Sequence, residues 1–294
     1  MVQLMKVVKK HGGLVTVHAT NGDVIDSLIA KHRAEKKLTP LYHYLSQPEV
    51  TEAEASARFT DMLHYTGCPG YIVHMTCEGA LNAVRESTQR NQKVFVETCT
   101  QYLTLDASLY KRKDGAKWVM SPPLREKKDQ TALWSGLNQG LVQVVGTDHC
   151  PFTLKQKAMG KKDFSKIPNG HPAIEHRMEL LFSSGVKTGK ISLNKYVEVT
   201  STNAAKIFGM YPKKGTIAIG ADADLVIFNP NKKHTLSVKT HHMNVDYSGY
   251  EGMKLTGKTE TVLMRGQVAI EKNKCLLKPG YGKFVKRGKT SLAI

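Results

Sequence analysis

The residues with the clearest chemical meaning follow a short apolar stretch near the middle of the chain. The apolar run 141–145 ends in a Gly-Thr pair and is followed directly by Asp148 and His149, ahead of a proline-containing turn. An α/β barrel presents catalytic groups in this way, because a buried strand fixes the backbone and its carboxyl end projects the side chain. Asp148 is therefore predicted to be catalytic, although a helix-capping or turn role would also suit an aspartate here.

Two histidines end apolar segments in the same manner. His18 follows the apolar residues 14–17, and His74 follows 70–73. Taken singly, each could be a hydrogen-bonded core histidine. Neutral imidazole, however, binds Zn²⁺ through one nitrogen while a neighbouring group orients the other. Two histidines and Asp148, each at the end of an apolar strand, indicate the ligand set of a hydrolytic metal site.

Composition narrows the class of protein. The chain has 294 residues, enough for one large α/β domain or two smaller ones. Its formal net charge of +18 comes partly from scattered lysine pairs without aromatic neighbours, which favours a solvated lysine-rich surface over a nucleic-acid groove. The five cysteines show no CxxC spacing, as expected in a reduced compartment. With neither a secretory signal nor a membrane-spanning stretch, we expect a cytoplasmic protein that binds neither nucleic acid nor membrane.

Strand-like and helix-like segments alternate up to Tyr211-Pro212, which predicts parallel β/α units. The strands are expected at 13–17, 70–74, 93–97 and 141–146, and the helices at 4–10, 23–34, 52–67, 78–90, 172–184 and 192–208. Beyond this point, short strands are expected at 215–217, 224–229, 235–238, 261–264 and 268–270, followed by an ordered basic tail at 278–289. We therefore expect two domains, 1–211 and 212–294. Four strands are half of the eight that close a barrel, and they would leave open parallel edges.

Several segments in order resemble the C-terminal two-thirds of dihydropyrimidinases and D-hydantoinases, which are cyclic amidohydrolases of the metal-dependent amidohydrolase superfamily. The resemblance implies an α/β fold, namely the C-terminal half of a TIM-like (β/α)₈ barrel with a small all-β sandwich portion. The segments that carry it are HATNGDVI (18–25), YIVHMTCEGAL (71–81), ETCTQYL (97–103), MSPPLR (120–125), VGTDHCPF (145–152), IPNGHPAIEHRMELLFS (167–183), STNAAKIFGMYPKKGTIAIGADADLVIFNP (201–230) and NVDYSGYEGMKLTGK (244–258).

The resemblance also implies site residues. His18 and His74 match the two histidines that bind the second metal, and Asp148 matches the aspartate that ligates the first metal and shuttles the proton. Ser121 and Asn169 match positions whose backbone groups hold the cyclic amide. Thr20 replaces the glutamate of the family's HAENG motif, which puts only the packing around His18 in doubt.

Part of the family's site has no counterpart in this sequence. A His-x-His pair, a carboxylated lysine bridging both metals and a substrate-contacting tyrosine lie upstream in such enzymes. The resemblance thus implies two divalent metals, most readily Zn²⁺, in a full-length form that is longer by on the order of 120 residues. The 294-residue chain alone is expected to be inactive.

The implied function is hydrolysis of a cyclic amide by a metal-activated hydroxide. The substrate is a small molecule, either a 5,6-dihydropyrimidine opened to an N-carbamoyl β-amino acid or a hydantoin opened to an N-carbamoyl amino acid. A homo-oligomer, tetramer or dimer, is expected. The alternatives are a non-catalytic scaffold like the collapsin-response mediator proteins, which lack the metal ligands, and an inactive truncated product.

Other reactive side chains near these motifs have simpler interpretations. His149 is expected near the substrate or beside the ligands rather than as a ligand. Cys77 and Cys150 are expected to be small packing residues. Glu175 and Arg177 are expected on a helix after the site, in structural pairs.

Overall fold

The computed structural model describes residues 1–291. Contacts within the chain divide it into two compact units. The first comprises Met1–Arg177 with Ser237–Glu251, and the second comprises Met178–Leu236 with the residues from Gly252 onward. The domain boundary expected at residues 211 and 212 stays a prediction.

A parallel sheet forms the centre of the first unit. Its strands are β1 (Val15–Val17), β2 (Gly70–Ile72), β3 (Val94–Cys99) and β4 (Val144–Gly146), in the spatial order β1-β2-β3-β4. Each strand pairs in parallel with the next one in the chain, so the predicted parallel β/α arrangement is confirmed. Within the described residues the sheet is open, with β1 and β4 at its edges.

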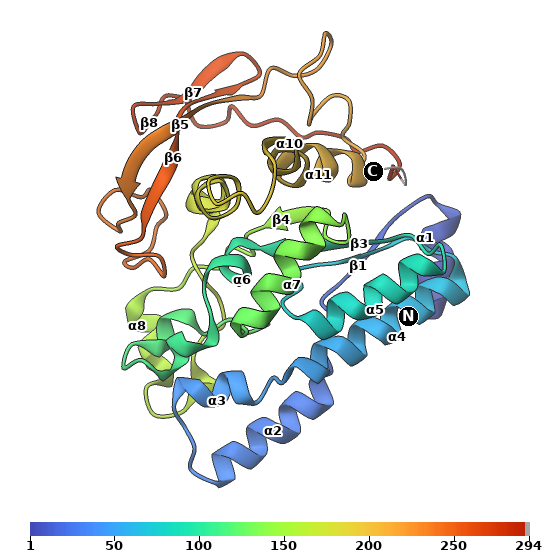
Figure 1. Ribbon diagram of the computed structural model, residues 1–294, viewed down its shortest axis with the longest axis vertical. Coiled ribbons are helices and arrows are strands. Elements are labelled where there is room, and N and C mark those ends of the chain that lie inside the picture. Colours follow the sequence, from blue (N-terminus) through green and yellow to red (C-terminus); the bar gives the residue numbers. More distant parts are fainter. Residues whose placement is uncertain (292–294) are drawn as a thin grey trace. The chain divides into compact units, whose positions relative to one another are not determined.

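Helices α4, α5 and α7 lie on one side of this sheet, with α5 packed against both α4 and α7 (Figure 1). The helices expected at 4–10, 23–34, 52–67 and 78–90 are all present. The helices of this unit are α1 (Val2–Lys10), α2 (Gly22–Ala34), α3 (Pro40–Leu45), α4 (Glu49–Thr66), α5 (Glu78–Gln89), α6 (Thr100–Thr104), α7 (Lys127–Asn138) and α8 (Leu154–Lys157). Short 3₁₀ helices cover Ala107–Lys111, Gly115–Trp118, Ala158–Gly160, Phe164–Lys166 and Ile174–His176.

Close packing between α4 and β2 fixes the sheet against its helical layer. A Cβ atom on Gly70 would lie 2.4 Å from Leu63 Cδ1 and 2.8 Å from Phe59 Cζ, so only glycine fits at the first residue of β2. The helix ends just beyond, where Gly67 adopts φ +63° and its N–H bonds the Leu63 carbonyl, a conformation that costs glycine little. These contacts hold the strand that leads to His74.

The second unit combines helices with an antiparallel sheet. The sheet has the order β5-β6-β7-β8. The helices and strands of this part of the chain are α9 (Arg177–Leu181), a π turn at Phe182–Val186, α10 (Leu193–Val197), a π turn at Glu198–Thr202, α11 (Asn203–Ile207), β5 (Leu225–Thr235), β6 (Lys254–Met264), β7 (Gln267–Glu271) and β8 (Lys274–Cys275). The rings of Phe182, Tyr196 and Phe228 pack together, with centroids 4.7 to 6.4 Å apart.

Two expectations about this unit are wrong. No strand forms at 215–217, where Ile217 is 88% exposed, and the segment expected at 235–238 contributes only Thr235 to β5. Within residues 1–291 neither run has a neighbouring strand to pair with, and a strand needs one to satisfy its backbone N–H and C=O groups. None of the helices within residues 1–291 combines the length and apolarity needed to cross a bilayer.

Candidate functional site

Three of the four strands, β1, β2 and β4, deliver the predicted site residues to the carboxyl end of the parallel sheet. His18 directly follows β1, His74 lies two residues beyond β2, and Asp148 lies two residues beyond β4. The ladder continues past the strand end, because Val73 N–H donates to the Val17 carbonyl at 3.2 Å. Since parallel strands share their carboxyl edge, the sheet collects the three side chains at one end.

The two histidines face each other directly. His18 Nδ1 lies 2.8 Å from His74 Nε2, and the rings meet edge to face. His74 is buried and its Nδ1 has no hydrogen-bond partner in the structure. His18 is exposed, and its Nε2 lies 2.8 Å from the Thr20 hydroxyl. Thr20 therefore orients the ring of His18 directly.

His74 and Asp148 share an unusual backbone conformation. Their φ angles are +45° and +47°, in the left-handed region that residues with side chains rarely adopt. Such a conformation costs of order 1–3 kcal/mol and persists only where the surroundings enforce it, often at functional sites. Both residues thus adopt this conformation two positions beyond the end of a strand.

Glu97, on β3, holds the turn at His74. Its carboxylate accepts hydrogen bonds from Tyr71 Oη at 2.8 Å and from the backbone N–H of His74. It also lies against Gly146, where an added Cβ would be 2.7 Å from Glu97 Cδ. Burial raises the pKa of the Glu97 carboxyl. No role was predicted for Glu97, although it ends an apolar run just as Asp148 does, and that signal would have identified it.

Burial determines the protonation of the histidine pair. Loss of hydration lowers the pKa of buried His74 and also that of His18, which keeps part of its surface in solvent, and the positive form of His18 further lowers the pKa of His74. The carboxylates of Glu52 and Asp148 oppose this shift at both histidines. The imidazoles are therefore neutral at pH 7, which is the form that binds metal.

Glu52 belongs to a buried ion pair behind the histidines. It accepts from the Arg125 guanidinium at 3.1 Å and from the backbone N–H of Thr76 at 2.7 Å. Arg125 Nε also donates to the Thr76 hydroxyl at 2.9 Å, and both charged side chains are at least 96% buried. This network connects the segment after β2 with the 120–125 segment.

The two predicted substrate-holding residues lie on segments that meet. Ser121 precedes a cis peptide bond to Pro122, and its hydroxyl accepts a hydrogen bond from Gln47 at 3.1 Å. Asn169 is exposed. The backbone N–H of Gly170 donates to the carbonyl of Val119 at 3.0 Å, so the segments around Ser121 and Asn169 are hydrogen-bonded to each other.

A model of the amidohydrolase family matches residues 1–269 of this sequence. The chain belongs to the amidohydrolase family. It is 49% identical to a D-hydantoinase of Geobacillus stearothermophilus over 96% of this chain and 60% of that protein. It is 44% identical to a D-hydantoinase of Ralstonia pickettii over 95% of this chain and 62% of that protein.

The fold of this chain is also similar to solved structures of such relatives. The crystal structure of the dihydropyrimidinase from Brevibacillus agri matches with a TM-score of 0.97 and 46% identity, over 99% of this chain and 64% of that one. The resemblance to D-hydantoinases and dihydropyrimidinases is thereby confirmed. This amidohydrolase sequence spans about three fifths of the length of the curated relatives it matches.

The donor set of this amidohydrolase suits a divalent metal in part. Two neutral imidazoles and a nearby carboxylate are the ligand types that zinc prefers, and the buried Nδ1 of His74 has no hydrogen-bond partner among the residues that the structure describes. Across residues 1–291, however, no group of three or more His, Cys, Asp and Glu side chains is close enough together to hold a metal ion. The ligand roles of His18, His74 and Asp148 therefore stay predictions.

The remaining candidates occupy structural positions in the amidohydrolase fold. His149 Nδ1 accepts from the backbone N–H groups of Ala173 and Ile174 at 3.1 and 3.3 Å, which suits a loop-holding role beside Asp148. Glu175 and Arg177 do make structural contacts, but with other partners. Glu175 pairs with His242 at 2.9 Å and Arg177 donates to the Val145 carbonyl at 2.9 Å. Cys77 is buried as expected, whereas Cys150 is exposed.

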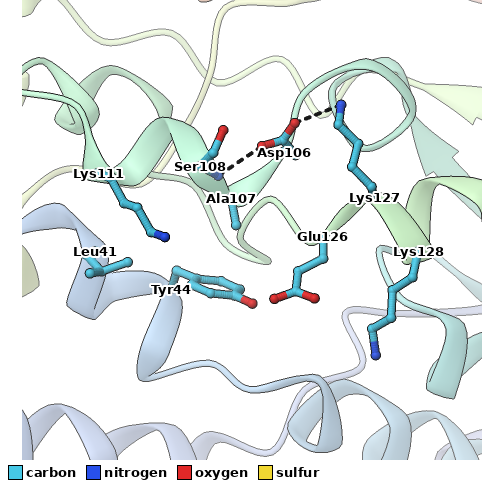
Figure 2. Close-up of a pocket in the computed structure, with 9 residues that line it drawn as sticks. All are labelled: Leu41, Tyr44, Asp106, Ala107, Ser108, Lys111, Glu126, Lys127 and Lys128. Carbon is cyan, nitrogen blue, oxygen red and sulfur yellow. Dashed lines mark hydrogen bonds and ion pairs between the residues drawn. The ribbon is translucent and has the colours of Figure 1, made fainter.

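A separate cavity of about 440 Å³ contains none of the predicted site residues (Figure 2). Its charged side chains are largely paired: Asp106 with Lys127 at 2.8 Å, and Lys128 with Glu49 at 3.0 Å. Asp106 also accepts from the Ser108 N–H at 3.0 Å. This pairing leaves the cavity without a set of converging catalytic groups, so we assign it no role.

Proposed function

We propose that this chain forms part of a metal-dependent hydrolase that opens cyclic amide rings. The observation that carries the proposal is the pair of facing imidazoles, His18 and His74, which lie at the same carboxyl end of the sheet as Asp148. The names of the relatives point to a hydantoin or a 5,6-dihydropyrimidine as substrate. The proposed products are an N-carbamoyl amino acid and an N-carbamoyl β-amino acid, respectively.

We propose further that β1–β4 are half of a (β/α)₈ barrel. Within residues 1–291 the sheet is parallel, packs against helices α4, α5 and α6, and has free edges at β1 and β4, as half of such a barrel would. The relatives contain more chain than this sequence matches, and that additional chain would supply the other strands. A homo-oligomeric state, tetramer or dimer, is part of the proposal.

Two divalent metals, Zn²⁺ in the first instance, would be held partly by this chain. His18 and His74 would hold one of them and Asp148 the other. When bound, a metal of this kind supplies Lewis-acid activation of water near neutral pH. The bridging carboxylated lysine expected from the family would come from outside this sequence.

The residues of this chain would then carry out the proton transfers. The water oxygen attacks the ring carbonyl carbon, and the Asp148 carboxylate accepts the proton that the water loses. When the C–N bond breaks, Asp148 returns this proton to the departing ring nitrogen. Asp148 is exposed at the strand end, so a substrate can reach it. Backbone groups of Ser121 and Asn169 would orient the ring.

The test requires a chain with the whole barrel. We would join this chain to the part of the Geobacillus stearothermophilus relative that it does not match, and refer to the product as the completed enzyme. Dihydrouracil and hydantoin hydrolysis are expected in the completed enzyme, and Asp148→Ala should reduce kcat by about 10³-fold or more. Asp26→Ala, which removes an exposed aspartate on α2, should leave kcat unchanged.

The same preparations test the metal assignment. Elemental analysis should find metal in the completed enzyme, and less of it when His18 and His74 are both replaced by alanine. Retained hydrolysis in Asp148→Ala would exclude Asp148 as the proton shuttle. Undiminished metal in the double histidine variant would exclude the pair as ligands.

A further inference from the structure

Lys157, the last residue of α8, is buried in a place where a lysine is rarely found. Only 2% of the residue is exposed. Its Nζ donates to three backbone carbonyls, those of Val119 at 2.7 Å, Pro168 at 2.7 Å and Gly170 at 2.8 Å. An ammonium group has three donors, so every one of them is used.

The three acceptors belong to the two segments on which the predicted substrate contacts lie. Val119 precedes Ser121 by two residues, and Pro168 and Gly170 flank Asn169 on either side. One nitrogen atom therefore fixes both segments at a single point, beside the hydrogen bond that already joins Gly170 to Val119.

We propose that Lys157 is a positioning residue that holds these two segments together so that their backbone groups can bind the ring of the substrate. The inference rests on the proposed function for its substrate, but the clamp itself is a property of this chain. Lys157 does not touch the reacting atoms and acts only through the segments around Ser121 and Asn169.

The chemistry of burial supports a specific need for lysine here. Taking an ammonium out of water is unfavourable unless its donors are satisfied, and within residues 1–291 no carboxylate forms an ion pair with Lys157. Burial lowers the pKa of Lys157 to about 7, whereas the three carbonyl oxygens around Nζ only accept hydrogen bonds and so favour the protonated form with its three donors. A methionine would fill the same space without that cost. What methionine lacks is the ability to bind three carbonyls at once.

Other side chains hold the same stretch of backbone one residue at a time. The carbonyl of Met120 lies 2.8 Å from Nε2 of buried His43, which must carry the proton because a carbonyl only accepts. Gln47 donates to the Ser121 hydroxyl. Residues 119, 120 and 121 are thus each held by a separate side chain, and Lys157 is the one that extends to the Asn169 segment.

The kinetic test uses Lys157→Met in the completed enzyme. If the clamp serves substrate binding, KM should rise about tenfold or more while kcat stays within about threefold, because interactions made equally in the ground and transition states are lost. Metal content should not change. Val84→Ala, which removes packing from the buried face of α5, is the matched control and should lower Tm without raising KM.

Hydrogen exchange tests the clamp without any substrate. In Lys157→Met, the amide of Gly170 and peptides covering 119–121 and 168–170 should exchange about tenfold faster, with α5 unchanged. This readout stands even if the completed enzyme proves to hydrolyse no cyclic amide, so failure of the proposed function and failure of the clamp are distinguishable.

A KM equal to that of the unsubstituted enzyme, or unchanged exchange at Gly170, would overturn the proposal. If Lys157→Met does not fold, Lys157→Gln keeps a polar donor and should give an intermediate KM and intermediate exchange. If neither variant folds, Lys157 is a folding residue and the assignment to substrate binding is rejected.

Discussion

Arg125 and Glu52 form an ion pair 3.1 Å long with both side chains almost entirely removed from solvent. Glu52 comes from the first turn of α4 and Arg125 from the segment that follows the cis peptide bond of Ser121. The pair is not isolated, because Thr76 bonds to both partners. One buried charge pair therefore ties α4, the turn after β2 and the Ser121 segment into a single unit.

Breaking this pair should be costly. Arg125→Met leaves the Glu52 carboxylate buried without its partner, and we expect a loss of about 3–5 kcal/mol in the free energy of unfolding. The double variant Arg125→Met with Glu52→Gln should lose less than the sum of the single variants, because neither partner then leaves a buried charge. Urea unfolding of the completed enzyme measures both. The exposed pair Arg58 and Glu54, at 3.3 Å, provides the control, and Arg58→Met should cost less than about 1 kcal/mol.

Stability should fall on acidification because of His43. Burial lowers the pKa of His43 to about 4, whereas an unfolded histidine has a pKa of about 6.5. Between these values the unfolded chain binds a proton that the folded chain does not, so folding stability declines from pH 6.5 to pH 4 by about 3 kcal/mol. His43→Gln cannot titrate and keeps a donor for the Met120 carbonyl. Urea unfolding at several pH values should therefore give a shallower dependence for His43→Gln, whereas parallel curves would contradict the prediction.

Gly146 should tolerate no side chain, since Glu97 occupies the space. Gly146→Ala forces the Glu97 carboxylate to move away from the Tyr71 hydroxyl and the His74 N–H. We expect a stability loss of about 1–3 kcal/mol and a fall in kcat/KM of about tenfold or more as His74 shifts. Gly22→Ala is the control, because an added Cβ there meets no atom within 4 Å. Equal kcat/KM in the two variants would show that Glu97 does not position His74.

The 294-residue chain by itself should self-associate. Strand β1 is an edge of the parallel sheet, and Leu4 and Val7 of α1 are each 56% exposed. Unpaired strand edges beside apolar side chains promote association between chains. We expect oligomers or aggregates in analytical ultracentrifugation, weak metal binding and no dihydrouracil hydrolysis. The unmatched part of the Geobacillus stearothermophilus relative, supplied as a separate chain, should restore metal binding and dihydrouracil hydrolysis. A monomeric, active preparation of the 294-residue chain alone would contradict this prediction.

The positions of His18, His74 and Asp148 could be predicted because each follows an apolar strand, a pattern contained within a few residues. The partners that hold them could not. Glu97 reaches His74 across neighbouring strands, and Arg125 meets Glu52 across 73 residues of sequence. Such contacts depend on how the elements pack. No helix is predicted at 40–45, although proline is well suited to the first position of a helix and Pro40 begins α3 there.

The arrangement of the parallel sheet has a consequence for how the polypeptide can assemble during synthesis. Every strand pairs with its immediate successor in the chain, so no strand must wait for a distant segment before it finds a neighbour. As the nascent chain leaves the ribosome, each helix–strand unit can dock on the edge that the previous unit has just presented. The sheet can thus grow in one direction, with β4 added last, and a stalled ribosome would leave a shorter sheet instead of a scrambled one.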